Sequence, residues 1–322
     1  MGSIFERKEI SGYDIIGDVH GHASMLKELL TMLGYRSANG TWHHGDGRKA
    51  IFVGDLIDRG PEQLETVKIV RGMVKQYDAL CIMGNHEYNA IQYHLGLRKL
   101  KDNDPHWTFL AQVPTESDAY TECVDWFMTL PLWLNMGSFG IVHACWDTPN
   151  MKILETTLRL GKDRRLSEDM HRLAAKGKPK DAPDRRAYEA LENILKGPEV
   201  SLPEGESFND KDGAVRHKIR TRWYRDDAST YRELAFMPTP ELPGITDRRL
   251  TERPRSLVPD KPVFIGHYWL YMADPREPLS DKVVCVDYSA GIDGPLVAYK
   301  WNKGDVALEK SRFVCVQGGQ SS

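Results

Sequence analysis

The sequence lacks any long hydrophobic run. No apolar stretch in its 322 residues approaches the roughly 20 residues that a membrane-spanning helix needs. The first ten residues, MGSIFERKEI, contain no apolar segment typical of a secretory signal, and Glu6 stands where N-myristoylation requires Ser or Thr. These absences predict a soluble, cytoplasmic protein with no membrane partner.

The sequence also lacks closely spaced cysteines and a strong charge of one sign. Its five cysteines are an odd number at wide spacing, with no Cys-x-x-Cys pair, which favours reduced thiols over disulfides. A net charge of −3 gives no general attraction to nucleic acid. Apolar residues make up 41%, enough to bury a substantial core.

The first part of the chain alternates strands and helices. The segments YDIIGD, AIFVGD and ALCIMGN predict three buried strands. Between them, HASMLKELLTMLG has leucines at helical spacing, and a second helix is predicted to open near Pro61, since proline is favoured in the first turn. This order predicts parallel strands joined by right-handed crossovers.

Later strands follow one another with little helix between them. They are predicted in FGIVHA, PVFIGH, KVVCVDY, LVAYKW and RFVCV. Part of the sheet system is therefore expected to be mixed or antiparallel. We predict an α/β fold of two mixed sheets packed face to face with helices outside, forming one domain over residues 1–322.

The segment 151–218 differs from the rest of the chain. It is polar, helical in pattern and interrupted by Pro and Gly. Between Lys152 and Lys196 there are 12 Lys and Arg against 8 Asp and Glu, a local charge of +4. We interpret the segment as a helical insertion that caps the active site. The alternative is a solvated helical hairpin without a role in the chemistry.

Polar side chains follow the ends of five predicted strands. They are Asp18 and His20 in GDVHG, Asp55, Asp58 and Arg59 in GDLIDRG, Asn85 and His86 in GNHE, His143 after IVHA, and His267 after FIGH. Because ligands collect at the carboxyl ends of strands in open α/β sheets, these clusters are expected to meet in one crevice.

These residue types suit transition metals. Aspartate, asparagine and histidine offer the mixed oxygen and nitrogen ligands of Mn²⁺, Fe or Zn²⁺ rather than those of Ca²⁺. Six of them can hold two divalent ions if Asp55 bridges the pair: Asp18, His20, Asp55, Asn85, His143 and His267. Such a pair lowers the pKa of bound water toward ~7 and stabilises an in-line displacement at phosphorus.

Each cluster has a simpler explanation when it stands alone. Gly-Asp turns are common, a single histidine after an apolar run is usually a buried core residue, and Asn85 could simply cap a helix. Three Gly-Asp or Gly-Asn clusters in order, followed by two histidines at strand ends, favour a metal centre.

The motifs GDxHG, GDxxDRG, GNHE, a later His-Ala step and a late Gly-His resemble the phosphoprotein-phosphatase-like branch of the calcineurin-like metallophosphoesterases. That branch includes serine/threonine phosphatases and bacterial diadenosine tetraphosphatases. The resemblance runs from Asp18 to His267 and, through CVDYSAGIDGPLVAY, into the last strands.

The resemblance implies a role for each residue. Asp18, His20 and Asp55 would hold one metal, and Asp55 would share the second with Asn85, His143 and His267. His86 would donate a proton to the leaving oxygen, kept charged by Asp58. Arg59 would bind phosphate oxygens. A second phosphate-binding arginine is expected in KIRTRWY, where Arg222 is preferred to Arg220. The alternative is that one of these two arginines is a surface residue in a strand.

One position departs from the family pattern. Where many relatives read HGG or HAG, this chain reads His143-Ala144-Cys145. Cys145 could narrow the pocket or be sensitive to oxidation, but packing is the default interpretation. The departure leaves the substrate class open.

The predicted function is hydrolysis of phosphate monoesters or nucleoside polyphosphates by a metal-bridging hydroxide, with two divalent ions, most simply Mn²⁺. The substrate could be a phosphoprotein, a dinucleotide or a nucleic-acid end, and the positive segment tilts toward a polyanion. The alternatives are a phosphodiesterase or nuclease on the same fold, and a phosphate-binding interaction module without catalysis.

Overall fold

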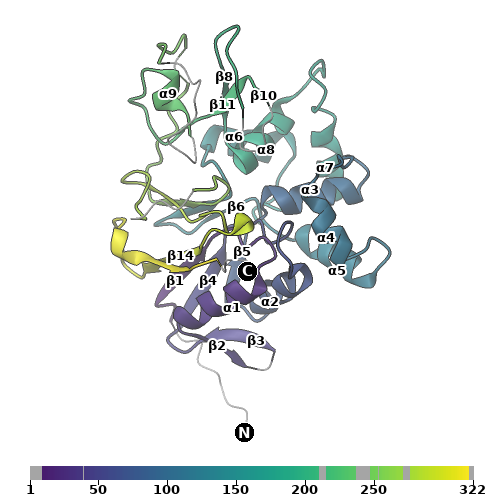
Figure 1. Ribbon diagram of the computed structural model, residues 1–322, viewed down its shortest axis with the longest axis vertical. Coiled ribbons are helices and arrows are strands. Elements are labelled where there is room, and N and C mark those ends of the chain that lie inside the picture. The colour runs from purple at the N-terminus through teal and green to yellow at the C-terminus, as the bar shows by residue number, and fades with distance from the viewer. Residues whose placement is uncertain are drawn as a thin grey trace.

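The computed structural model describes residues 9–38, 40–209, 215–236, 247–252, 254–270 and 276–318. Two sheets lie at its centre (Figure 1), with strand orders β15-β14-β1-β4-β5 and β13-β12-β7-β6. The first sheet comprises β1 (Gly12–Ile16), β4 (Arg48–Phe52), β5 (Ala79–Cys81), β14 (Leu296–Asn302) and β15 (Phe313–Val316). The second comprises β6 (Trp133–Asn135), β7 (Gly140–Val142), β12 (Val263–Ile265) and β13 (Val283–Cys285).

Both sheets are mixed, as predicted. Strands β1, β4 and β5 are parallel, while β14 runs antiparallel to β1 and β15 antiparallel to β14. In the second sheet β7, β12 and β13 are parallel and β6 is antiparallel. The prediction missed a hairpin of β2 (Tyr35–Ala38) and β3 (Thr41–His44), whose exposed polar residues give no strand-like apolar alternation.

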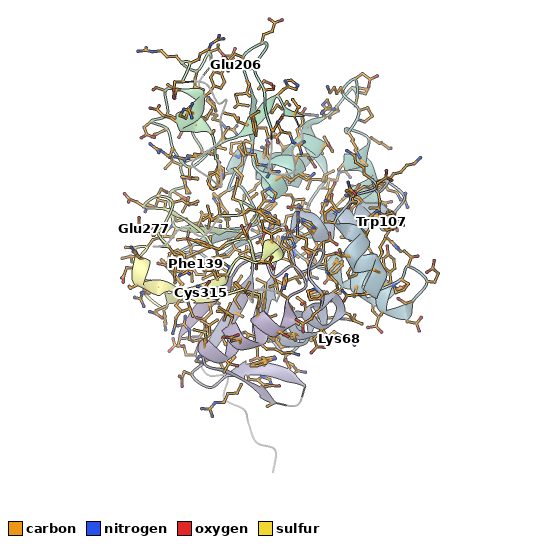
Figure 2. All side chains as sticks on the ribbon, viewed as in Figure 1. Lys68, Trp107, Phe139, Glu206, Glu277 and Cys315 are labelled. Atoms are coloured by element: carbon orange, nitrogen blue, oxygen red, sulfur yellow. The ribbon has the colours of Figure 1, made fainter. Side chains whose placement is uncertain are left out.

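Apolar side chains fill the space between the two sheets. Ile15 and Ile51 of the first sheet belong to the same buried cluster as Phe264 and Val284 of the second. Phe139, just before β7, belongs to this cluster and is labelled on the left of Figure 2, whereas Lys68 and Trp107 are labelled on the right. This arrangement holds the carboxyl ends of strands from both sheets at one place.

Helices cover the sheets and carry the rest of the core. They are α1 (Ala23–Met32), α2 (Gln63–Lys75), α3 (Asn85–His94), α4 (His106–Gln112), α5 (Asp118–Phe127), α6 (Thr148–Thr157), α7 (Glu168–Ala175), α8 (Arg186–Lys196) and α9 (Tyr231–Leu234). The side chains of Ser117, Asp147 and Ser167 cap α5, α6 and α7 by accepting backbone N–H groups. Two short 3₁₀ helices, η1 (Ala290–Ile292) and η2 (Lys310–Arg312), lie near the last strands.

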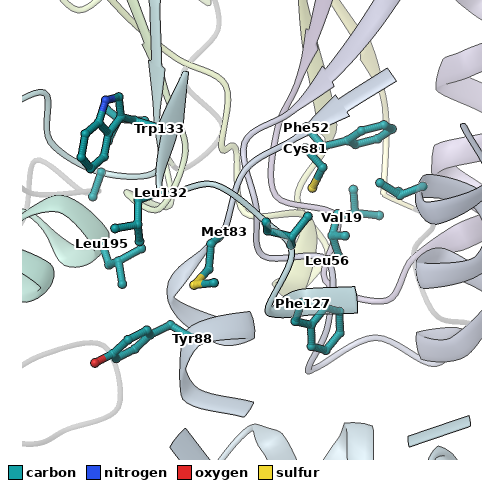
Figure 3. Close-up of a cluster of buried hydrophobic side chains, with 14 of the residues drawn as sticks. Val19, Phe52, Leu56, Cys81, Met83, Tyr88, Phe127, Leu132, Trp133 and Leu195 are labelled. Atoms are coloured by element: carbon teal, nitrogen blue, oxygen red, sulfur yellow. The ribbon is translucent and has the colours of Figure 1, made fainter. Parts of the chain in front are cut away.

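Within its described residues, the segment 151–218 contains most of α6, then α7, α8, three short strands and the first residue of a fourth. These strands are β8 (Glu199–Ser201), β9 (Phe208–Asn209), β10 (Val215–Arg216) and β11 (Lys218–Arg220), and residues 210–214 lie outside the described residues. The apolar face of α8 belongs to the large core cluster, and Figure 3 shows Leu195 beside Leu132. The carbonyl of Ile194 accepts the N–H groups of Ala144 and Cys145. The segment is therefore packed against the end of β7, and its role as a cap stays a prediction.

Helix α7 contacts α3 through a buried histidine. His171 is 0% exposed; its Nδ1 accepts an N–H from Gln92 at 2.9 Å, and its ring lies 5.3 Å from that of Tyr88. Burial lowers the pKa of His171 to about 4, and the neighbouring Glu168 only partly opposes this. The folded protein therefore holds this ring neutral across a pH range in which the unfolded chain binds a proton.

This contact predicts a loss of stability in mild acid. The pKa of His171 is lower in the folded protein than in the unfolded chain, so its contribution to the free energy of unfolding is complete above pH ~6.5 and is lost as pH falls toward 4. About 2 kcal/mol should be lost between pH 7 and pH 5. Urea unfolding of metal-free protein should show a steeper loss of stability in the wild type than in His171→Gln, in which other buried histidines such as His20 still contribute. Equal slopes in the two proteins would contradict the prediction.

Candidate metal centre

The predicted ligands come together around one carboxylate oxygen. Oδ2 of Asp55 lies 3.3 Å from Nε2 of His143, 3.8 Å from Nε2 of His86 and 3.9 Å from Nε2 of His20. Two groups able to hold a metal share this aspartate: His20, Asp55 and His86, and Asp55, His143 and His267. The structure thus brings together residues that follow β1, β4, β5, β7 and β12.

The amide oxygen of Asn85 marks the second group. Its Oδ1 lies 3.0 Å from Nε2 of His143 and 2.6 Å from Nδ1 of His267. The backbone N–H of His267 donates to Oδ2 of Asp18 at 2.9 Å, which joins the two sheets across the site. Each of the six predicted metal ligands therefore has a direct contact with, or lies within 4 Å of, another member of the set.

Glycines allow the loops after β4 and β5 to touch. A Cβ on Gly54, whose φ is +96°, would lie 2.4 Å from the backbone nitrogen of Gly84. A Cβ on Gly84 would lie 2.2 Å from Oδ1 of Asp55. Any larger residue at either position would push the two loops apart, and with them Asp55 and Asn85.

Several site residues adopt a backbone conformation that side chains disfavour. Positive φ angles occur at His20 (47°), Asp55 (52°), Asp58 (70°), Arg59 (76°) and His267 (71°). For residues other than glycine this conformation costs on the order of 1 kcal/mol each and persists only where surrounding contacts enforce it. Such strain gathers at functional sites, so its concentration here supports a functional site.

Glu87 has a role that sequence reasoning missed. Its carboxylate accepts the backbone N–H groups of Gly84, Asp55 and Leu56 at 2.7–2.9 Å. The sequence places Glu87 at the end of the motif GNHE but does not indicate this contact. The side chain fastens the Asp55 loop to the start of α3, so it orients two of the predicted ligands at once.

The buried polar atoms of the site fit bound cations. Among the described residues, Oδ1 of Asp18, Nε2 of His20 and Nε2 of His267 are buried without a hydrogen-bond partner. The ring of His20 is oriented by its Nδ1, 2.9 Å from the carbonyl of Ile57, and that of His143 by its Nδ1, 2.7 Å from the carbonyl of Val53. Such outer contacts are typical of metal-binding histidines, which leave the other nitrogen for the ion.

The charges of the site lead to the same conclusion. Burial and the carboxylates of Asp287 and Asp55 raise the pKa of Asp18 well above its usual range. Burial and the adjacent His86 lower the pKa of His20 to about 3, which keeps this ring neutral. A divalent ion needs ionised carboxylates and neutral imidazoles, so a bound ion would relieve the repulsion that raises the pKa of Asp18 and would find the ring of His20 already neutral.

His86 and Asp58 form the predicted proton-donor pair. Nδ1 of His86 lies 2.5 Å from Oδ2 of Asp58. Burial would lower the pKa of His86, but the carboxylates of Asp55 and Asp58 raise it above its ordinary value. Burial would raise the pKa of Asp58, but the facing imidazoles of His86 and His106 lower it well below its usual range. The geometry suits a charged imidazole beside a carboxylate.

The predicted phosphate-binding arginines lie in different surroundings. The guanidinium of Arg59 stacks on Trp269, 4.1 Å from the ring centroid, and the same indole lies 5.6 Å from the ring of His20. The positive charge of Arg220 lowers the pKa of His267, after the larger effect of burial, whereas that of Arg222 acts on Tyr224. The charge of Arg220 thus acts on a predicted metal ligand, and the preference for Arg222 stays a prediction.

Cys145 is packed rather than open to the site. It is 0% exposed, and burial raises the pKa of its thiol well above the usual range. Of the five cysteines, all free, only Cys315 is not fully buried. The default interpretation of Cys145 as a packing residue agrees with this environment.

A separate cavity of about 400 Å³ lies beside the site. Trp223 lines it, and the indole N–H of this residue donates to the carbonyl of Ala144 at 3.2 Å and to the hydroxyl of Tyr268 at 3.0 Å. These two residues directly follow His143 and His267, so Trp223 contacts both the cavity and the neighbours of two predicted metal ligands. None of the predicted metal ligands lines this cavity.

The family profile described as calcineurin-like phosphoesterase matches residues 13–205, well over half of the chain. The chain belongs to this family. The matched region contains four of the five motif clusters, and the membership confirms the resemblance and the fold class predicted from the sequence. No helix in the described residues is long and apolar enough to cross a bilayer.

Curated relatives are similar over part of their length. A bis(5'-nucleosyl)-tetraphosphatase PrpE (asymmetrical) of Halalkalibacterium halodurans is 48% identical over 84 residues, 26% of this chain and 34% of that protein. A protein of the same name from Oceanobacillus iheyensis is 33% identical over 135 residues, which are 41% of this chain and 54% of that protein. The chain thus spans about a third to a half of these relatives.

The solved structure of a cold-active protein-tyrosine phosphatase from a psychrophilic Shewanella matches 97% of this chain and 81% of its own, with a TM-score of 0.51 and 15% identity. At this identity the likeness concerns the fold alone.

Proposed function

We propose that the protein is a metal-dependent phosphoesterase that hydrolyses phosphate monoesters or nucleoside polyphosphates with two divalent ions. The observation that carries the proposal is the pair of metal-binding groups that share Asp55, flanked by buried ligand atoms without other partners. Asp18, His20 and Asp55 would hold one ion, and Asp55, Asn85, His143 and His267 the other. The ions would supply Lewis acidity and a water activated near neutral pH.

The chain's own residues supply the remaining chemistry. Arg59, held against Trp269, would bind phosphate oxygens, and we favour Arg220 as the second arginine because its charge acts on His267. His86, held by Asp58 through Nδ1, would give the proton on its other ring nitrogen to the leaving oxygen. Glu87 keeps the two ligand-bearing loops together during turnover.

For the substrate we favour a dinucleoside polyphosphate over a phosphoprotein. The tetraphosphatase names of the relatives support this choice, as does the local positive charge of the segment 151–218. A phosphodiesterase on the same fold and a non-catalytic phosphate-binding module remain the competing functions, and the assay below separates them.

Metal add-back tests the proposal. Metal-stripped protein should be inactive on p-nitrophenyl phosphate and on diadenosine tetraphosphate, and Mn²⁺ should restore hydrolysis of at least one and bind at two equivalents per chain. Faster hydrolysis of bis-p-nitrophenyl phosphate than of the monoester would favour a phosphodiesterase. Two bound ions with no hydrolysis of any of the three would favour a binding module, and no bound metal would overturn the proposal.

A further inference from the structure

The carboxylate of Asp58 contacts two histidines, not one. Its Oδ2 lies 2.5 Å from Nδ1 of His86, and its Oδ1 lies 2.9 Å from Nδ1 of His106. Sequence reasoning gave no role to His106, which follows Pro105 in an otherwise polar stretch. Both oxygens of the carboxylate behind the proton donor are therefore held by imidazoles.

The surroundings of His106 fix the orientation of its ring. The side chain is 0% exposed, its ring stacks on Phe109 at 5.4 Å and meets the edge of Tyr93 at 5.7 Å. Its backbone N–H donates to Oδ1 of Asp104 at the start of α4. Its Nε2 is buried without a hydrogen-bond partner among the described residues, so Asp58 is the polar contact on which this ring depends.

We propose that His106 is a positioning residue, which holds Asp58 by donating its Nδ1–H so that the other carboxylate oxygen stays aligned with His86. This inference rests on the proposed function. A carboxylate bonded through one oxygen alone can rotate about its last side-chain bond, and one bonded through both cannot. The backbone N–H of Asp58 adds a third constraint by donating to Gln63.

Loss of His106 is expected to affect one part of the reaction, the protonation of the leaving oxygen. Hydrolysis forms a bond from water oxygen to phosphorus, breaks the bond from phosphorus to the leaving oxygen, and moves a proton from His86 to that oxygen. A proton from the attacking water then replaces the one that His86 gave up, so the products are the alcohol and phosphate. His106 keeps its own proton throughout and touches neither substrate nor metal ligand. Loss of His106 should therefore slow the hydrolysis of esters whose leaving group needs a proton and leave the hydrolysis of other esters unchanged.

The test uses two aryl phosphates and matched variants of the full-length, Mn²⁺-loaded protein. His106→Phe keeps the ring packing and removes the donor, whereas the side-chain amide of His106→Asn can place an N–H near the position of Nδ1. On phenyl phosphate, kcat of His106→Phe should fall about 10-fold or more, within the range for residues that orient another group, with KM unchanged. On 2,4-dinitrophenyl phosphate, whose leaving group needs no proton, the change should be less than about 2-fold.

His106→Asn should recover most of the lost activity on phenyl phosphate, and all variants should keep two Mn²⁺ per chain. An equal loss on both substrates, or loss of metal, would show a merely structural role and overturn the inference, as would no loss at all. If His106→Phe does not fold, His106→Leu supplies the same comparison. A wild-type protein that hydrolyses neither ester would instead contradict the proposed function.

Discussion

Replacing Asp55 with Asn is expected to lower phosphatase activity by ~10³-fold or more, because several kcal/mol of charge stabilisation by the ions would be lost. Asp55 is the residue that both metal-binding groups share. Burial would raise its pKa, but the imidazoles of His143 and His86 hold it well below the usual range, so the side chain is an anion in the folded protein. Asparagine keeps the shape and removes the charge between the two ions.

Metal content separates this prediction from simple misfolding. Asp55→Asn should retain less than two equivalents of Mn²⁺ after dialysis, while the surface control Asp163→Asn should match the wild type in metal and activity. Unfolding of the metal-free proteins should show whether the variant still folds. A folded variant that binds two ions and keeps near-normal kcat would mean that Asp55 does not bridge a metal pair.

Replacing His86 with Asn is expected to lower kcat on p-nitrophenyl phosphate by ~10²-fold or more, the scale of a lost general acid. The variant should keep its metal, because the backbone N–H of His86 still donates to Oδ1 of Asp55 and the ring is not needed to hold Asn85. KM should change little if Arg59 and Arg220 carry most of the phosphate binding. Steady-state kinetics and metal analysis of the same preparation check all three points.

A double variant tests whether His86 and Asp58 act as a unit. Asp58→Asn alone should also lower kcat, and adding it to His86→Asn should cost little more, because residues of one catalytic unit are not additive. Independent, multiplying effects would argue against the donor pair. A His86→Asn protein that has lost its metal would instead assign His86 to the ion, as its place beside His20 and Asp55 allows.

The strand ends were the predictable part of this site. Asp18, Asp55 and Asn85 each follow a short apolar run and a glycine, and the convergence of strand ends in an α/β fold then brings them together. The fold class followed from the same pattern, since helices separate the early strands, whereas among the described residues no α-helix separates the strands from β12 to β15.

Long-range contacts were not predictable in the same way. His106 joins Asp58 across 48 residues through a short helix with no motif of its own, and nothing local in the sequence marks it. The surroundings of Arg220 and Arg222 likewise depend on how the chain folds near β11, and sequence alone does not fix this. Glu87 and Asp287 did carry a signal, because each lies inside a motif, but each accepts a backbone N–H from a loop distant in sequence, at Asp55 and Trp269 respectively.

The positive φ angles at five site residues have a consequence for how related sequences diverge. Glycine at positions 20, 55, 58, 59 or 267 would relieve backbone strain on the order of 1 kcal/mol, while abolishing the side chain. Only selection for the chemistry opposes that gain. In a lineage released from this selection, these five codons should drift toward glycine or asparagine sooner than their buried neighbours, so homologous genes would record whether hydrolysis or mere binding has been retained.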